Sequence, residues 1–246
     1  MGLQPVRECL RVWGYGVTEV ALTAGDSPKL AALERFAVAQ GVGSVLRLPR
    51  GEMDRRAQNG LHQGAIALAP PLDLRDWSEV VARPQLIAIA LDRVQDPQNF
   101  GAVVRSAVAT GDAALVWGEH AAAPLTPATF RASAGAIEHA TLSRVASLKD
   151  ALARARDAGA QVIGLAAGAE QLLSSIDLRG PTVIVLGNEG DGLQPSVRKA
   201  CTQLAAVVRP RVLDSLNASV AAAIALYEAE RQRSHPVGQL AAESIQ

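Results

Sequence analysis

The stretch Leu213-Asp-Ser-Leu-Asn-Ala-Ser-Val-Ala-Ala-Ala-Ile-Ala-Leu-Tyr227 joins a polar cluster directly to an Ala-rich helical pattern. Ser215, Asn217 and Ser219 place three side-chain hydrogen-bonding groups at the start of that pattern. Ser and Asn commonly cap helices, so one interpretation makes Ser215 or Asn217 a simple N-cap. We expect a helix over residues 217–233, with its apolar first half buried.

A second informative segment, Val183-Ile-Val-Leu-Gly-Asn-Glu-Gly-Asp-Gly192, predicts a strand that enters a turn with three glycines. Ligands of open α/β sheets bind at the carboxyl ends of strands. The spacing Gly187-x-x-Gly190-x-Gly192 matches neither the dinucleotide fingerprint nor the phosphate loop. Either the glycines only permit a tight turn, or they let a small ligand approach the backbone; Glu189 within the turn favours the second interpretation.

The third segment, Leu91 to Ala107, contains Asp96-Pro-Gln-Asn-Phe-Gly101 between an apolar run and a helical pattern. Asn99 is placed where it could cap that helix by accepting from free backbone amides. Arg105 is flanked by Val103, Val104, Ala107 and Val108. It is either a buried salt-bridge partner or a phosphate-binding fork, because its planar donors suit bidentate contacts.

Alternating helical and apolar patterns predict an α/β fold with two domains. Pro70 and Pro71 mark the boundary, since proline lacks an amide donor and restricts the residue before it. We expect a small α/β domain at 1–70, a linker at 71–82 and a larger domain at 83–246. Short apolar runs between helices are typical of buried parallel strands; in the larger domain they cover residues 86–91, 113–117, 161–165, 183–186 and 204–208.

Composition describes an ordinary folded chain of 246 residues, 49% of them apolar. No signal-peptide pattern or membrane-spanning stretch is present, and Cys9 and Cys201 are far apart, so we expect a cytoplasmic protein without disulfides or membrane association. The formal net charge of zero does not by itself suggest a nucleic-acid partner. The four histidines lack metal-ligand spacing, so no metal site is predicted.

Taken in chain order, the three segments resemble the signature blocks of the SpoU family of RNA ribose 2′-O-methyltransferases, in the SPOUT superfamily. The resemblance implies a parallel-sheet α/β domain whose C-terminal chain forms a trefoil knot, an exception to the rule against knotted topologies. It also implies S-adenosylmethionine as cofactor. The backbone around Gly187, Asn188, Val207 and Leu216 would hold that cofactor.

The same resemblance places Asn99, Arg105, Glu189, Ser215 and Asn217 at the family's polar catalytic positions. The Arg105 guanidinium stays protonated in ordinary protein environments. We therefore expect it to anchor an adjacent phosphate and to stabilise the developing 2′ oxyanion. This chain departs from the family in one loop: Val208 and Arg211 stand where a Pro and a Gly are usual.

The N-terminal part also resembles the family's ribosomal-protein-like RNA-binding domain, through Gln58-Asn-Gly-Leu-His-Gln-Gly-Ala-Ile-Ala67. His62 and Gln63 are candidates for RNA contacts, and a plain turn before a strand is the alternative. Arg209 and Arg211 are candidates for contacts with RNA phosphates.

By this resemblance the substrate would be structured RNA, most simply a guanosine of 23S rRNA, and the protein would dimerise through its C-terminal helices. A tRNA or antibiotic-resistance rRNA methyltransferase and a catalytically silent ribosome-assembly factor stay open as alternatives.

Overall fold

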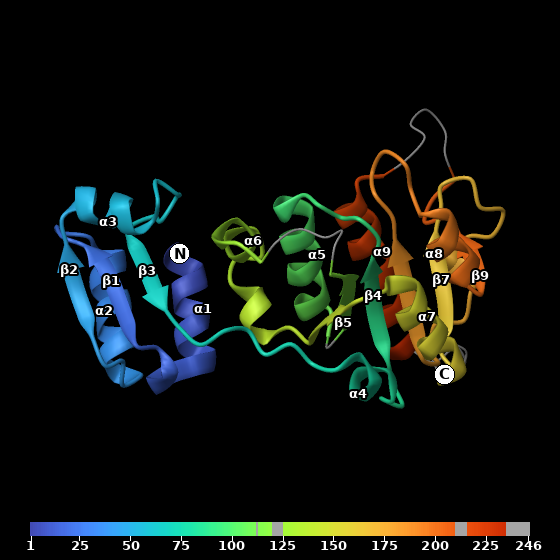
Figure 1. The fold of residues 1–246 in the computed structure, drawn as a ribbon, viewed down its shortest axis with the longest axis horizontal. Coiled ribbons are helices and arrows are strands. Elements are labelled where there is room, and N and C mark those ends of the chain that lie inside the picture. The colour runs from blue at the N-terminus through green and yellow to red at the C-terminus, as the bar shows by residue number, and fades with distance from the viewer. Residues whose placement is uncertain (112, 120–124, 210–215, 235–246) are drawn as a thin grey trace, which may run out of the picture. The chain divides into compact units, whose positions relative to one another are not determined.

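The computed structural model describes residues 1–111, 113–119, 125–209 and 216–234. They form two compact units, one made of Met1–Asp73 with Pro124–His139 and the other of Leu74–Ala123 with Ala140–Gln246. Figure 1 shows the helices and strands of both. Each unit has its own sheet and its own apolar core.

The first unit is built on a three-stranded sheet of order β2-β1-β3. Central β1 (Glu19–Thr23) runs parallel to β2 (Val45–Leu48) and antiparallel to β3 (Ala65–Leu68). Side chains alternate across a strand. Val20 and Leu22 therefore face the core formed with α1 (Leu3–Trp13) and α2 (Pro28–Ala39), and Ala21 faces α3 (Arg50–Arg56).

A segment from the middle of the chain completes this unit. It contains α6 (Pro127–Ala132) and a short 3-10 helix, η2 (Ala136–His139). Trp13 Nε1 donates to Glu138 Oε2 at 2.8 Å, and His139 Nε2 lies 3.0 Å from Glu8 Oε2. Burial raises the pKa of Glu138. The placement of this segment in the first unit differs from the prediction of a larger domain over residues 83–246, which included the whole segment.

The second unit contains a six-stranded parallel sheet of order β6-β5-β4-β8-β7-β9 (Figure 1). The strands are β4 (Ile87–Leu91), β5 (Ala114–Gly118), β6 (Leu142–Val145), β7 (Gln161–Leu165), β8 (Thr182–Leu186) and β9 (Gln203–Ala205). Five correspond to the apolar runs expected from the sequence, and the parallel α/β class is confirmed. β6 was missed because its apolar signal is short.

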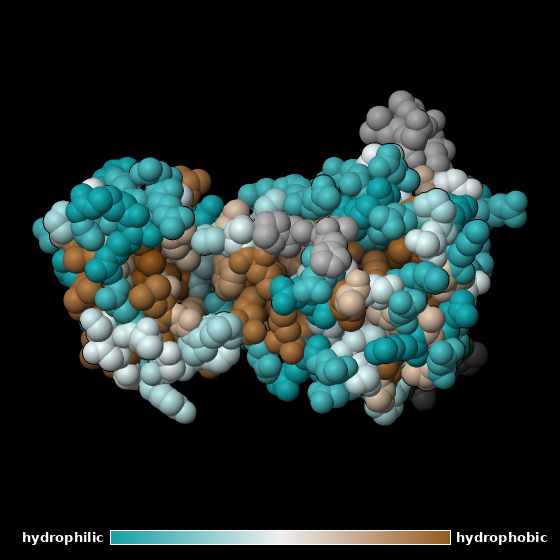
Figure 2. All heavy atoms as spheres, viewed as in Figure 1, coloured by the Kyte–Doolittle hydropathy of each residue, from teal (hydrophilic) through white to brown (hydrophobic). Residues whose placement is uncertain are grey.

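Helices cover both faces of this sheet, as a parallel sheet requires. One face carries α4 (Trp77–Val81), α7 (Leu148–Asp157) and α8 (Pro195–Ala200), and the other carries α5 (Pro97–Ala109) and α9 (Ala218–Ser234). Phe100 of α5 meets Trp117 of β5 edge to face, with ring centroids 5.2 Å apart. Hydrophilic residues dominate the face of this unit that is visible in Figure 2.

The division differs from the expected linker at 71–82. Trp77 is only 3% exposed and donates its Nε1 hydrogen to the Ala151 carbonyl at 2.9 Å, so α4 is part of the second unit's core. Pro70 and Pro71 could not show that the indole of Trp77, a few residues later, is buried.

Helix α9 runs from the carboxyl ends of β4 and β8 to the places where these two strands begin. Near its end, Arg233 donates to the carbonyl oxygens of Leu86 at 3.0 Å and Gly180 at 2.7 Å, close to where β4 and β8 begin. Burial lowers the pKa of this guanidinium. The expectation that the whole first half of α9 is buried was wrong: Ala218, Ala222 and Ala225 are buried, but Val220 and Ile224 on another face are exposed.

The threaded loop of a trefoil knot would include residues 210–215, which lie outside the described residues, as do Ser215 and Arg211. Among the described residues, none of the helices combines the length and the apolar character needed to cross a membrane.

Candidate active site

Parallel pairing of β4 with β8 sets Leu91 directly beside Leu186. The segments that follow these two strands therefore begin next to each other at the carboxyl edge of the sheet. The Asp92 amide donates to the Leu186 carbonyl at 2.8 Å, which continues the pairing by one residue. Residues from both segments can consequently meet above the sheet, where parallel α/β folds place their ligands.

The glycine turn after β8 is closed by backbone hydrogen bonds. Asn188 N donates to Gly192 O at 3.2 Å, and Gly192 N donates to Asn188 O at 2.9 Å. Gly192 has φ +66°, a conformation that favours glycine. Gly187 is needed for a different reason: a Cβ there would lie 2.3 Å from the Gly192 carbonyl carbon. Positive φ therefore explains Gly192, and close backbone approach explains Gly187.

The Glu189 carboxylate joins the three segments that the sequence singled out. Its Oε1 accepts from Asn99 Nδ2 at 2.8 Å, from Asn217 Nδ2 and, at 3.5 Å, from the Ala218 amide. Asn217 Nδ2 also donates to Asn99 Oδ1 at 3.0 Å. Three of the expected catalytic residues thus form one hydrogen-bonded cluster, which we call the Asn-Glu-Asn triangle.

Asn217 has a second role, the capping role considered from the sequence. Its Oδ1 accepts from the Ser219 amide at 2.9 Å and the Val220 amide at 3.3 Å at the start of α9. Asn99, by contrast, does not cap α5. Asp96 does so by accepting from the Gln98 amide at 3.0 Å, because Pro97 occupies the first helical position and places the cap one residue before it.

Arg105 lies on α5, six residues beyond Asn99 and so about 9 Å further along the helix axis. The side chain is exposed, and among the described residues it makes no hydrogen bond or ion pair. The buried salt-bridge interpretation was therefore wrong. The free guanidinium fits the alternative of a phosphate fork, although the structure does not bring it into the Asn-Glu-Asn triangle.

A cavity of about 1120 Å³ opens beside the triangle. Glu189 lines it, and so do all four residues expected to hold the cofactor: Gly187, Asn188, Val207 and Leu216. Leu165, Leu172 and Ala221 supply apolar walls. Ligand pockets commonly combine apolar walls with a few polar groups. Arg198 also lines the cavity, and no pattern in the sequence around Leu165, Leu172 or Arg198 indicated that these residues belong to the site.

The residues expected to contact RNA are placed differently from one another. His62 is buried, its Nδ1 accepts from the Gly64 amide at 3.0 Å, and its Nε2 lies 3.0 Å from Asp54 Oδ1. Both ring nitrogens of His62 therefore have partners within the protein. This supports the interpretation of the segment as a plain turn before a strand and corrects the prediction that His62 contacts RNA. Gln63 is exposed, with φ +49°. Arg209 is exposed at the rim of the cavity and donates to the Glu170 carbonyl at 3.1 Å.

Comparison with known proteins agrees with this site. Residues 86–227 match the model of the SpoU rRNA methylase family. Over 241 residues, or 95% of this chain and 76% of the relative, the sequence is 39% identical to a protein of Mycolicibacterium vanbaalenii named "Uncharacterized tRNA/rRNA methyltransferase".

Two solved structures are similar over almost the whole chain. One is the SpoU methyltransferase AviRb from Streptomyces viridochromogenes in complex with AdoMet, with a TM-score of 0.77, 26% identity, and 95% of this chain and 89% of that one covered. The other is an AdoMet-bound rRNA methyltransferase from Sinorhizobium meliloti, with a TM-score of 0.77, 25% identity, and coverage of 94% and 85%.

The fold and the site therefore define an RNA methyltransferase. The chain belongs to the SpoU family, whose methyl donor is S-adenosylmethionine, and the resemblance of its three motifs is confirmed.

The glycine turn yields a direct prediction. Gly187→Ala forces a Cβ into the backbone of Gly192, whereas a Cβ at Gly190 meets only Asn188 Oδ1 at 3.6 Å. Overpacking of this kind costs about 1–3 kcal/mol, which corresponds to about 5–150-fold in affinity if the bound turn carries the cost. We expect calorimetry with S-adenosylhomocysteine to show that loss for Gly187→Ala and near-normal binding for Gly190→Ala. Equal affinities for the two variants would contradict the role assigned to the turn.

Proposed function

We propose that this protein transfers a methyl group from S-adenosylmethionine to the 2′ hydroxyl of a ribose in structured RNA, specifically a guanosine of 23S rRNA. The observation that carries the proposal is the Asn-Glu-Asn triangle at the edge of a large cavity. It joins one residue from each of the three motifs, at three of the five positions to which the resemblance assigns polar catalytic groups. The rRNA assignment is supported by the family match and by the small α/β unit at the N-terminus.

The cavity suits the adenosine part of the cofactor. Gly187 offers backbone without a side chain, and Val207 and Leu216 offer apolar surface beside it. A flat base can lie against such walls while backbone groups recognise its edge. When bound, S-adenosylmethionine supplies a methyl group activated by its positive sulfonium.

In this proposal the triangle orients the ribose. Glu189 Oε1 is occupied by its donors, and Oε2 has no hydrogen-bond partner among the residues that the structure describes. We assign Oε2 to accept from a ribose hydroxyl. The amides of Asn99 and Asn217 hold the carboxylate in place, and alignment of this kind can supply much of a rate enhancement.

Arg105 is proposed to bind the phosphate next to the target ribose. An arginine side chain acts in such a site through its charge and not as a base. A fixed positive charge near the developing 2′ oxyanion stabilises the transition state. Ser215 stays a proposed catalytic residue by its place in the segment 213–227, beside Asn217.

The first unit is proposed to bind RNA, with Gln63 as a contact, and Arg209 and Arg211 as phosphate contacts of the second. The formal net charge of zero means that such contacts must be local. Both cysteines are free, which is compatible with the cytoplasmic location that we propose.

A labelling experiment tests the substrate. The protein is incubated with methyl-labelled S-adenosylmethionine and separate rRNA and tRNA pools, and the RNA is digested to nucleosides. We expect label in large-subunit rRNA as 2′-O-methylguanosine. Label in tRNA alone would contradict the assignment of rRNA as the substrate. Cofactor binding without any label would favour a catalytically silent RNA-binding factor. The presence of Val208 and Arg211 where the family usually has Pro and Gly favours that alternative.

Arg105→Ala tests the charge role. We expect kcat to fall by about 100–1000-fold, the loss typical of removing one oxyanion-stabilising group, with the Kd for S-adenosylhomocysteine unchanged. Arg154→Ala, which removes another exposed arginine from the same unit, is the control and should methylate normally. Normal methylation by Arg105→Ala would remove Arg105 from the mechanism.

We also propose a homodimer that forms through α9. Val220, Ile224 and Tyr227 are 45%, 38% and 63% exposed and recur at the spacing of one helix face. An apolar stripe of this kind suits a self-complementary interface about a two-fold axis.

Sedimentation analysis tests this dimer. We expect Ile224→Asp to shift the protein to monomer, because it buries a charge in the interface. Val38→Asp, at an apolar position 64% exposed in the first unit, should leave the dimer intact. A monomeric wild-type protein would refute the dimer.

A further inference from the structure

Arg93 occupies an unusual backbone conformation directly after β4. Its φ is +58°, in the left-handed region that residues with a side chain rarely adopt. Such strain persists only where surrounding contacts determine the conformation, and it is common near functional sites. The contacts of Arg93 therefore indicate what the conformation achieves.

Three hydrogen-bonding groups of Arg93 hold the glycine turn after β8. Its carbonyl accepts from Asn188 Nδ2 at 3.2 Å, its Nη1 lies 3.3 Å from Asp191 Oδ2, and its Nη2 donates to the Gly192 carbonyl at 3.4 Å. The left-handed backbone lets one residue present its carbonyl and its side chain to the same turn. Asn188 at the start of the turn and Asp191 and Gly192 at its end are thereby bonded to the residue that follows Asp92.

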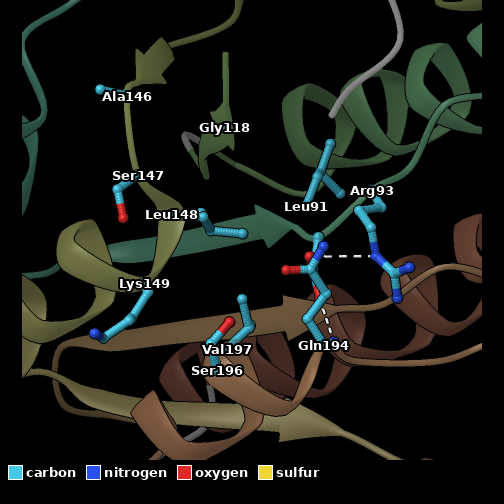
Figure 3. A pocket seen from close by; sticks show the side chains of 11 residues that line it. Leu91, Arg93, Gly118, Ala146, Ser147, Leu148, Lys149, Gln194, Ser196 and Val197 are labelled. Atoms are coloured by element: carbon cyan, nitrogen blue, oxygen red, sulfur yellow. Dashed lines mark hydrogen bonds and ion pairs between the residues drawn. The ribbon is translucent and has the colours of Figure 1, made fainter. Parts of the chain in front are cut away.

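The Asp92 carboxylate contacts both the Arg93 side chain and the backbone after the turn. The Asp92 side chain is 4% exposed, and its Oδ1 lies 3.9 Å from Arg93 Nε. Its Oδ2 accepts from the Gln194 amide at 2.6 Å, so the carboxylate also fixes the residue that follows the turn and precedes α8. Arg93 Nε is buried and has no hydrogen-bond partner among the residues that the structure describes, so the nearby Asp92 carboxylate compensates its charge. Figure 3 shows both interactions as dashed lines.

Arg93 and Asp92 do not line the large cavity. They line a separate pocket of about 270 Å³, drawn in Figure 3, whereas Asn188, Asp191 and Gly192 line the cavity of about 1120 Å³. The arginine therefore contacts the turn and not the space in front of it. Any effect that it has on a bound molecule must pass through the turn.

We propose that Arg93, held by Asp92, is a positioning residue that fixes the glycine turn in the shape that binds S-adenosylmethionine. The inference rests on the proposed placement of the cofactor in the large cavity. Without these ties the turn samples other shapes, and apparent affinity falls by the fraction of time spent in the competent one. Affinity and KM for the cofactor carry the effect, and kcat at saturating cofactor changes less.

Calorimetric titration with S-adenosylhomocysteine tests the inference. We expect Arg93→Ala to weaken binding about tenfold, the loss expected when a charged group gives up its two hydrogen bonds. Arg179→Ala is the matched control, because Arg179 forms an exposed ion pair with Asp177 in the same unit, and its affinity should stay within about twofold. Methylation assays should show the Arg93→Ala loss in KM for the cofactor.

A double-mutant cycle separates positioning from general damage. If Arg93 acts through Asp191, then Arg93→Ala in an Asp191→Ala background should cost less than in the wild type. Arg93→Lys, which keeps the charge but not both donors, should bind with intermediate affinity, and it replaces Arg93→Ala in the titration if that variant does not fold.

The outcomes are distinct. Folded Arg93 variants that bind S-adenosylhomocysteine like the wild type would overturn the inference. Wild-type protein that binds no S-adenosylhomocysteine would instead overturn the proposed function.

Discussion

A single carboxylate holds the site together. Glu189 Oε1 accepts from side chains 90 residues before it and 28 residues after it, so one atom links the glycine turn, α5 and the start of α9. No two of these segments are neighbours in sequence, and the loss of this acceptor would leave the Asn99 and Asn217 amides without their shared partner. Glu189 of the turn and Ala218 of α9 both line the cavity beside the triangle.

The parallel sheet makes that convergence possible. Pairing of β4 with β8 brings Asp92, Arg93 and the glycine turn to the same edge, and Asn217 starts α9 there while Arg233 fixes its other end near the start of the same strands. The triangle holds the turn at Glu189, and Arg93 holds it at Asn188, Asp191 and Gly192. A turn held by several contacts can keep a shape suited to one ligand before that ligand binds, which reduces the ordering cost of binding.

Much of this arrangement could be predicted from the sequence, because apolar runs between helical patterns report buried parallel strands and the three polar motifs each follow such a run. Other features carried no local signal. Arginine does not favour positive φ, so only the contacts with Asn188, Asp191 and Gly192 reveal Arg93. The packing of residues 125–139 on the first unit and the inward orientation of His62 likewise depend on long-range contacts that periodicity does not encode.

A crystal structure with bound S-adenosylhomocysteine would test the central claim most directly. The account predicts that the adenosine lies against Gly187, Val207 and Leu216, with the sulfur facing the side of the cavity where Glu189 meets Asn99 and Asn217. Ligand bound elsewhere, or a structure in which Glu189 contacts neither asparagine, would contradict it.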